Sequence, residues 1–280
     1  MPRLSVVLIT RNEIQNIHAC LRSLAFADEV VVVDSGSTDG TVEAARAAGA
    51  TVIPTTDWPG FGPQKNRALD AATGDWVFSI DADEQLTPEL AASLQGAIHS
   101  GKYDAWEVNR RSIYCGQYMA HSGWYPDRVL RLFRRGSARF SDDLVHERVV
   151  TQAAVGRLEG DLLHNSMPHF ESVLAKLDRY STAGALALNA KGKKGSLGKA
   201  LGHGSWAFLR TYVLKLGFLD GRLGLALAIS NAEGTYYRYM KLWLLQREAA
   251  PRVRGEPAVG EPFGRDGTAG KETRSESKNA

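Results

Sequence analysis

The first hundred residues alternate short apolar runs with longer stretches in which apolar residues recur every three or four positions. The short runs predict four strands, at 4–9, 30–33, 51–53 and 75–80. The longer stretches predict helices at 12–24, 40–48 and 63–72. The second strand is continuous in valine, as expected when both faces of a parallel sheet are buried. This order predicts an α/β fold with a mostly parallel, doubly wound sheet and helices on both faces.

A further helix start follows the fourth strand. Thr87 and Pro88 are suited to be the N-cap and the first residue of a helix. From about residue 169 the spacing of apolar residues becomes helical throughout, interrupted by a basic turn at 191–195. We therefore expect a C-terminal helical appendage after the α/β part.

The appendage has an apolar stripe made by Trp206, Leu209, Val213 and Leu216. No charge-free apolar run approaches the ~18 residues that a bilayer-spanning helix needs. One interpretation is an anchor that lies in the plane of a membrane surface. The alternative is a set of helices that pack on the α/β part or on a second subunit.

The composition changes again near residue 249, where Gly, Pro, Ser, Thr and charged residues dominate. Such a segment cannot bury enough apolar surface to fold, so we expect a disordered tail. The chain is accordingly divided into an α/β domain at 1–168, a basic helical region at 169–248 and a tail at 249–280.

Charge is distributed unevenly along the 280 residues, although the net charge is only +3. Residues 191–248 contain ten Lys or Arg against three Asp or Glu, whereas the first 190 residues carry a net charge of −5. Basic segments attract phosphate-rich or anionic-lipid surfaces. The two cysteines, Cys20 and Cys115, lie far apart, which favours a reducing compartment. Because the N-terminal apolar run is too short for a signal peptide, we expect a cytoplasmic protein.

Polar residues gather where three of the predicted strands end. These groups are Thr10-Arg11-Asn12-Glu13, the segment 34–40 that begins with Asp34-Ser35, and Asp81-Ala82-Asp83. The carboxyl ends of parallel strands meet at one edge of a sheet, where ligands bind in this architecture. The three groups therefore predict a ligand site. Solvated acidic turns and helix capping by Ser37, Thr38 or Asp39 are the alternatives.

The acidic pair has the chemistry of a metal and phosphate site. Carboxylates at the end of a buried strand need a partner, and Mg²⁺ or Mn²⁺ takes one or two carboxylates together with phosphate oxygens. Asp34 could accept a hydrogen bond from a base or from a ribose hydroxyl. Neither the dinucleotide-binding pattern Gly-x-Gly-x-x-Gly nor a P-loop is present, so a nucleotide ligand of another class is indicated.

These motifs, in this order, resemble family 2 glycosyltransferases. The resemblance rests on residues 5–13, 31–41, 64–68 and 81–83 and covers about the first hundred residues. It implies the GT-A fold and transfer of a sugar from a nucleoside diphosphate with inversion at the anomeric carbon. Residues 124–147 and 206–224 are also similar to the subgroup that adds glucose to the heptose of the lipopolysaccharide inner core.

The resemblance implies a nucleotide-sugar site and a divalent metal, Mg²⁺ or Mn²⁺. Asp83 is the implied ligand of the metal and diphosphate, with Asp81 beside it. The implied nucleotide-sugar residues are Thr10, Asn12, Glu13, Asp34, Ser35, Lys65, Arg67 and Asp81. Ser35 departs from the family, which often has a second acid there. For Lys65 and Arg67, a solvated helix face is the alternative to neutralising phosphate charge.

An inverting transfer requires a general base near the acceptor hydroxyl. In the family this base is an acid some tens of residues after the Asp-x-Asp motif, and Glu147 is our choice, with Asp142 and Asp143 as rivals. His146 could bind the diphosphate or complete the metal shell, or be structural. The candidate acceptor residues are Trp124, Tyr125, Arg128 and Arg131, of which the two aromatic residues could equally belong to the core.

The sequence thus predicts a metal-dependent inverting glycosyltransferase, peripheral to the cytoplasmic face of the inner membrane, that uses UDP-glucose and a lipopolysaccharide core acceptor. Its expected partners are a UDP-sugar, a lipid-linked saccharide and the membrane surface, and no nucleic acid. Another lipid-linked or polysaccharide acceptor is one alternative. A non-catalytic nucleotide-binding scaffold on the membrane is the other.

Overall fold

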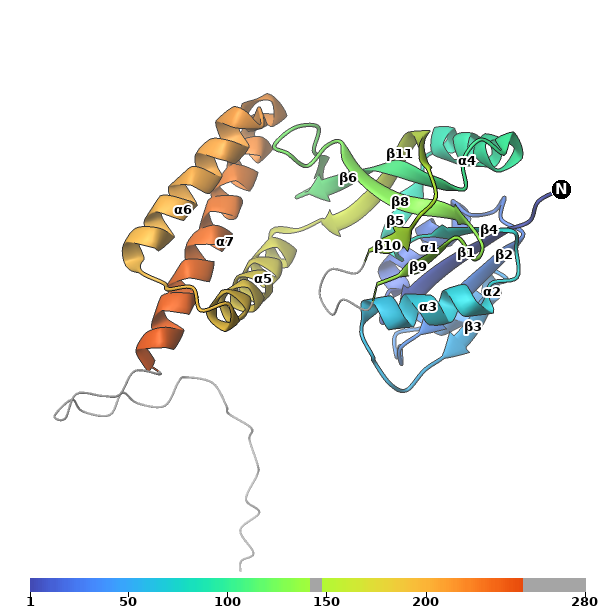
Figure 1. Cartoon of the computed structure of the whole chain (residues 1–280), viewed down its shortest axis with the longest axis horizontal. Helices are drawn as coiled ribbons and strands as arrows, with labels where there is room; N and C mark the ends of the chain where they lie inside the picture. Colours follow the sequence, from blue (N-terminus) through green and yellow to red (C-terminus); the bar gives the residue numbers. More distant parts are fainter. Residues whose placement is uncertain (142–147, 249–280) are drawn as a thin grey trace, which may run out of the picture.

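The structure, a computed structural model, describes residues 1–141 and 148–248. Figure 1 shows an α/β body with the helices α5, α6 and α7 extending away from it. The N-terminal half of the body alternates strands and helices as the apolar pattern predicts. Its elements are β1 (Leu4–Thr10), α1 (Ile14–Arg22), β2 (Glu29–Asp34), α2 (Thr41–Ala47), β3 (Thr51–Pro54), α3 (Phe61–Ala71) and β4 (Trp76–Ser79).

The second half of the body is mostly β-structure, for which the sequence analysis gave no element boundaries except the start of one helix at Thr87-Pro88. It consists of β5 (Glu84–Leu86), α4 (Pro88–Ser100), β6 (Ala105–Tyr114), β7 (Gln117–Tyr118), β8 (Asp127–Arg134), β9 (Ala138–Phe140), β10 (Val149–Thr151) and β11 (Val155–Met167). Strands β9 and β10 form a separate antiparallel pair.

Within the described residues the main sheet has the strand order β3-β2-β1-β4-β8-β6-β11-β5, with β7 paired to β6. The first four strands are parallel, as predicted. Strand β8 then runs antiparallel between β4 and β6, and β5 runs antiparallel to β11. The predicted class, a GT-A-like α/β fold with a C-terminal helical appendage, is confirmed, and its sheet is mixed beyond β4.

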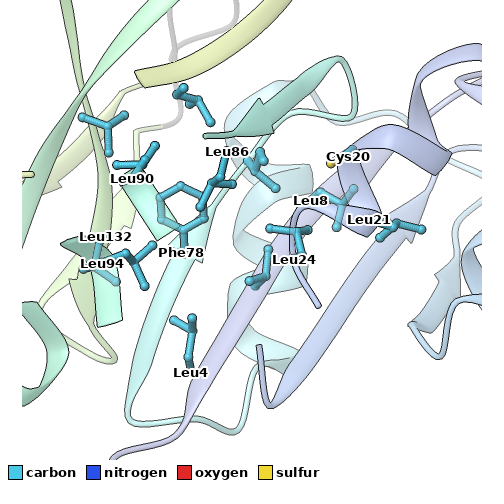
Figure 2. Close-up of a cluster of buried hydrophobic side chains, with 14 of the residues drawn as sticks. Leu4, Leu8, Cys20, Leu21, Leu24, Phe78, Leu86, Leu90, Leu94 and Leu132 are labelled. Carbon is cyan, nitrogen blue, oxygen red and sulfur yellow. The ribbon is translucent and has the colours of Figure 1, made fainter. Parts of the chain in front are cut away.

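Side chains alternate between two cores because successive strand residues point to opposite faces. Val6 and Leu8 of β1 belong to one core with helices α1 and α4, whereas Val7 belongs to a second core with α3. Figure 2 shows the first core, where Phe78 of β4 lies among leucines from β5, α4 and β8. Burial on both faces explains the continuous valines of β2.

Helix α4 begins where the sequence places it. Thr87 is its N-cap and Pro88 its first residue, and the Thr87 hydroxyl accepts hydrogen bonds from the backbone N–H groups of Leu90 and Asp161, both at 3.2 Å. We expect Thr87→Ala to lower the free energy of unfolding by about 1 kcal/mol. Urea unfolding measures this loss, and Thr87→Ser, which keeps the hydroxyl, should restore most of it. Equal losses in the two variants would contradict the capping role.

Glu29 fastens the end of β2 that lies farthest from Asp34. Its carboxylate accepts hydrogen bonds from the Ser5 hydroxyl and from the backbone N–H and hydroxyl of Thr73. Although burial alone would raise the pKa of Glu29, these hydrogen bonds lower it below its ordinary value.

A lowered pKa makes the contribution of Glu29 dependent on pH. It is complete above the ordinary pKa of about 4.3 and is lost as the pH falls through the folded-state value. We expect Glu29→Gln to destabilise the protein by about 1 kcal/mol at pH 7 and by much less at pH 3. Urea unfolding at both pH values measures this difference, and a penalty that does not change with pH would contradict it.

The appendage consists of α5 (Phe170–Ala190), α6 (Leu197–Leu209), the π-helical turn η1 (Arg210–Leu214), the 3₁₀ turn η2 (Gly217–Asp220) and α7 (Gly221–Glu248). Helix α7 packs against both α5 and α6. Asp220 joins the appendage to the body, because its carboxylate accepts from the Ser122 hydroxyl at 2.8 Å and from the N–H groups of Ala120 and His121 at 3.1 Å. The appendage therefore packs on the α/β body through the segment after β7.

No helix among the residues that the structure describes is both long and apolar enough to cross a bilayer. The appendage nevertheless exposes large apolar side chains along α6, η1 and η2. We call this set the apolar ridge, and it consists of Trp206, Leu209, Val213, Leu214, Leu216, Phe218 and Leu219.

Candidate active site

The polar groups that follow β1 and β2 are joined directly by hydrogen bonds. The Thr10 hydroxyl donates to Asp34 Oδ2 at 2.8 Å. The backbone N–H of Asn12 donates to Ser37 Oγ at 2.8 Å, and Asn12 Oδ1 accepts from the N–H of Thr38 at 2.9 Å. The predicted gathering of these two groups at one edge of the sheet is therefore present in the structure.

Helix capping at this edge differs from the expectation. Asn12, the first residue of the predicted helix at 12–24, lies one residue before the observed N-cap position and has a left-handed φ of 57°. The N–H of Ile14 is instead satisfied by Asp39 Oδ2 from the neighbouring loop, at 3.1 Å. The N-cap of α2 is Gly40, without a side-chain cap. Capping across loops occurs because the two segments lie side by side, which local sequence does not reveal.

Asp34 is only 2% exposed, and its carboxylate is fully used within the chain. Oδ1 accepts from the N–H groups of Gly36 and Ser37, and Oδ2 accepts from the hydroxyls of Thr10 and Ser37. Such a carboxylate holds the loop in place, and any contact with a base or ribose must compete with these donors.

Ser35, which stands where the family often has an acid, faces helix α3. Its hydroxyl accepts from Gln64 Nε2 at 3.0 Å, and the same amide group donates to Thr55 Oγ1 at 2.6 Å. Gln64 is fully buried and had no role in the sequence analysis. It connects the loop after β2 to α3.

Asp81 lies between two cations, and both of its oxygens are paired. Lys65 Nζ is 2.8 Å from Oδ1, and an Arg131 guanidinium nitrogen is 2.8 Å from Oδ2. Burial alone would raise the pKa of Asp81, but Lys65 and Arg131 outweigh it and hold that pKa well below its ordinary range. Asp81 therefore stays ionised and positions Lys65.

Glu84 is a buried acid whose importance the sequence analysis missed. It is 0% exposed, lies 2.7 Å from the Arg131 guanidinium, and accepts from the backbone N–H of Asp81 at 2.9 Å. Burial raises the pKa of Glu84 even though Arg131 opposes the shift. Arg131, which was expected to contact the acceptor, is only 6% exposed and instead pairs with both Asp81 and Glu84.

Asp83 faces His164 of β11, a residue that the sequence analysis did not select. His164 Nε2 lies 3.3 Å from Asp83 Oδ2, and Nδ1 lies 3.0 Å from the Ser112 hydroxyl on β6. Asp83 is 28% exposed and His164 17%, so the pair is accessible to a ligand. Only the pairing of β11 with β5 and β6 brings His164 here, and no motif around it marks this position.

Glu13 completes the acidic edge. Its carboxylate accepts from the Asn16 amide at 2.9 Å. Burial raises the pKa of Glu13, and the charges of Asp83, Asp39 and Asp81 raise it further. An electrostatic environment of this kind favours the arrival of a cation.

The fit of a divalent ion can be judged from these groups. Within residues 1–141 and 148–248, no three His, Cys, Asp or Glu side chains converge as a closed metal cage. Asp83 and His164 provide one carboxylate oxygen and one imidazole nitrogen on an accessible edge. This suits an ion of the Mg²⁺ or Mn²⁺ type, which takes few protein ligands and fills its shell with phosphate oxygens and water.

His164→Gln tests the role of this imidazole. We expect the affinity for Mn²⁺ in the presence of UDP to fall by about 10- to 100-fold, because a residue that holds or orients a metal ligand is lost. Calorimetric titration of Mn²⁺ measures the change. His99→Gln is the matched control, because His99 is exposed at the end of α4. An unchanged Mn²⁺ affinity in His164→Gln would contradict the role of His164 in metal binding beside Asp83.

The remaining predicted residues lie in different environments. Arg67 forms a two-pronged ion pair with Asp57 on the surface, at 2.8 and 2.6 Å, and only Lys65 of the two predicted cations contacts Asp81. Arg128 is exposed on β8. The Tyr125 hydroxyl donates to Asp161 at 2.9 Å, and Trp124 packs edge-on against Tyr114 with ring centroids 6.0 Å apart. Asp142, Asp143, His146 and Glu147 lie outside the described residues.

Comparison with known proteins identifies the class of this protein. The family model described as Glycosyl transferase family 2 matches residues 5–157, more than half of the chain. The chain therefore belongs to glycosyltransferase family 2, and the resemblance seen in its motifs is confirmed.

Curated relatives match over most of the chain. The lipopolysaccharide core biosynthesis glycosyltransferase LpsC of Rhizobium meliloti (strain 1021) is 32% identical over 255 residues, which cover 84% of this chain and 93% of LpsC. The uncharacterised glycosyltransferase RT0209 of Rickettsia typhi is 31% identical over 255 residues, with 86% and 87% covered.

Among solved structures, glucosyl-3-phosphoglycerate synthase from Mycobacterium tuberculosis, in complex with Mn²⁺, UDP and glucosyl-3-phosphoglycerate, is 33% identical over 39% of this chain and 44% of its own. The TM-score of that match is 0.35.

Proposed function

We propose that this family 2 glycosyltransferase is metal-dependent, uses UDP-glucose, and transfers glucose with inversion to the heptose of a lipopolysaccharide core acceptor. One observation carries the proposal. Asp83 and His164 form an accessible pair at the sheet edge, beside Asp81, Lys65 and Arg131. The similarity to LpsC, a lipopolysaccharide core biosynthesis glycosyltransferase, supports the acceptor class.

In this proposal each part of the edge has one task. Asp83, with His164, would hold the metal ion, which when bound neutralises charge on the departing diphosphate. Asp81 stays ionised and keeps the Lys65 ammonium near the phosphates. Thr10, Asn12, Glu13, Asp34 and Ser35 form or support the nucleoside pocket.

The proton of the acceptor hydroxyl needs a base. Glu147 is the proposed base, with Asp142 and Asp143 as rivals and His146 as a further candidate ligand of the metal or diphosphate. A single displacement needs no enzyme nucleophile. Comparing the pH profile of transfer in Glu147→Gln with those in Asp142→Asn and Asp143→Asn separates the three acids.

Calorimetric titration with UDP, GDP, ADP and CMP, each with Mn²⁺ and again with EDTA, tests the donor site. We expect binding of UDP alone, lost with EDTA. Binding of GDP in place of UDP would indicate a GDP-sugar donor, and binding of none of the four would favour the non-catalytic scaffold.

A transfer assay then tests the sugar and the acceptor. UDP-glucose is compared with UDP-galactose on lipopolysaccharide that ends in heptose and on lipopolysaccharide that lacks it. Transfer that does not need heptose would favour another lipid-linked or polysaccharide acceptor.

We also propose that residues 1–168 are the catalytic domain and that 169–248 hold it on the cytoplasmic face of the inner membrane. Two features support this placement: the apolar ridge, and the ten Lys or Arg against three Asp or Glu at 191–248. Flotation with vesicles of phosphatidylcholine and phosphatidylglycerol tests it. Failure of the full chain to float with anionic vesicles at low salt would contradict it.

A further inference from the structure

A cavity of about 920 Å³ lies where α5, η1 and α7 meet the ends of β6 and β11. Its apolar walls include Tyr114, Trp124 and Leu177, from the body and from α5. Four cationic side chains line it, Lys176, Arg210, Lys215 and Arg238, and its lining contains no carboxylate from residues 1–141 or 148–248. A cavity of this size, lined by positively charged and aromatic side chains, has the composition of a binding site for an anionic ligand.

The charges of these four side chains are not neutralised within the part of the chain that the structure describes, where none of them forms an ion pair. Lys176 Nζ donates to the backbone oxygen of Ser166 at 2.7 Å. The Nε atom of Arg238 is buried, and no described residue accepts a hydrogen bond from it. A buried donor without a partner is costly, and an acceptor bound in the cavity would remove this cost.

Helix α5 is shaped to admit Arg238. A Cβ atom on Gly184 would lie 2.6 Å from Arg238 Nε and 2.9 Å from its Cδ. Alanine, the more favourable residue inside a helix, would place its Cβ in the space that Arg238 occupies. Because Gly184 has no side chain, the Arg238 side chain of α7 can pass close to α5 and line the cavity.

The cavity continues the strands that carry the candidate metal site. Ser112 contacts His164, which faces Asp83, and Tyr114 of the cavity wall follows Ser112 by two residues on β6. Two residues of a strand span about 7 Å, and their side chains lie on the same face. A ligand in the cavity can therefore extend towards the proposed site of transfer.

The cavity also borders the apolar ridge. Arg210 lies in the chain between Leu209 and the η1 residues Val213 and Leu214, which are 45% and 57% exposed. A molecule that joins an anionic group to an apolar chain would place the first against the cations and the second along the ridge.

We propose that this cavity binds a phosphate group of the lipid-linked acceptor, and so recognises a phosphate-bearing amphiphile. The inference rests on the proposed function and adds the feature by which the acceptor is recognised. Arg238 and Arg210 bind the phosphate oxygens, Lys176 and Lys215 add charge, and Trp124 packs against the body of the acceptor.

Calorimetry on the full chain with dioctanoyl phosphatidic acid below its micelle concentration tests the proposal, with inorganic phosphate and dioctanoyl phosphatidylcholine as comparison probes. We expect phosphatidic acid to bind best. The double variant Arg210→Gln/Arg238→Gln should weaken its binding at least about tenfold. The matched control is Lys191→Gln/Lys194→Gln, which removes two exposed charges from the turn after α5 and should change binding less than about twofold.

A second variant separates the site from general charge. Gly184→Ala keeps every cation and favours the helix, but its Cβ displaces Arg238. We expect it to weaken phosphatidic acid binding several-fold and to raise the KM for the acceptor, with kcat and the KM for the donor unchanged.

Three results would overturn the proposal: equal loss in the double variant and its control, inorganic phosphate binding as tightly as phosphatidic acid, or no binding of either. The second result would assign the cavity to a free anion. Binding of UDP with Mn²⁺ is measured on every variant. If the wild-type protein does not bind UDP with Mn²⁺, the proposed function is rejected. If it binds UDP but binds inorganic phosphate as tightly as phosphatidic acid, this inference alone is rejected.

Discussion

Replacing Asp83 with alanine should lower kcat for sugar transfer by at least about 100-fold, while the fold is retained. Asp83 is partly exposed and, among the residues that the structure describes, its side chain is paired with His164 alone, so its removal leaves no buried charge there without a counterion. The loss should come with loss of metal dependence, because Asp83 is the proposed carboxylate ligand. UDP release is measured at saturating donor over a range of Mn²⁺ concentrations, and UDP affinity is measured with Mn²⁺ and with EDTA.

Asp104→Ala is the matched control for this variant. Asp104 is also an exposed carboxylate with one cationic partner, Arg134 at 2.8 Å, but it lies away from the sheet edge that carries Asp83. We expect its activity to equal that of the wild type. Full transfer activity in Asp83→Ala would remove the basis of the proposed catalytic site, and a loss that excess Mn²⁺ restores would indicate a weakened metal site.

Replacing Arg131 with leucine should lower the free energy of unfolding by about 3–5 kcal/mol, because breaking a buried ion pair leaves an uncompensated charge. Glu84 is 0% exposed and has Arg131 as its close cation, with Arg110 farther away at 3.7 Å. Asp81 would keep Lys65 but lose its second cation. Urea unfolding at pH 7 measures the loss.

Arg128→Leu is the control, since Arg128 is exposed on the same strand, and it should change stability by less than about 0.5 kcal/mol. Combining Arg131→Leu with Glu84→Leu should recover much of the loss, because no buried carboxylate then remains at position 84. A loss below about 1 kcal/mol for Arg131→Leu alone would show that Glu84 is protonated without difficulty, in line with its raised pKa, and that the ion pair adds little.

The first half of the fold could be predicted because its signals are local. The valines of β2, the three- and four-residue spacing of α1 and the Thr87-Pro88 pair each act within a few residues. The strands from β6 to β11 could not be delimited, because β8 runs antiparallel between two strands from different parts of the chain. Such pairing depends on contacts that are distant in sequence.

The candidate site was partly visible for the same reason. Thr10, Asp34 and Asp81 end parallel strands, so topology alone brings them to one edge. Arg131 and His164 arrive on β8 and β11, and no spacing in the sequence connects them with Asp81 or Asp83. Lys65 and Arg67 look equivalent in the sequence, but only Lys65 lies on the buried face of α3.

By itself, the sequence determined the order of strands and helices up to residue 80, the start of α4, the family, and the acids that end β2 and follow β4, because each depends on local pattern and motif. The tertiary structure alone decided which cations pair with Asp81, that His164 faces Asp83, and that four cations of the appendage line one cavity. These are contacts between residues far apart in the chain. Their partners are fixed by sheet pairing and helix packing, which no short stretch of sequence specifies.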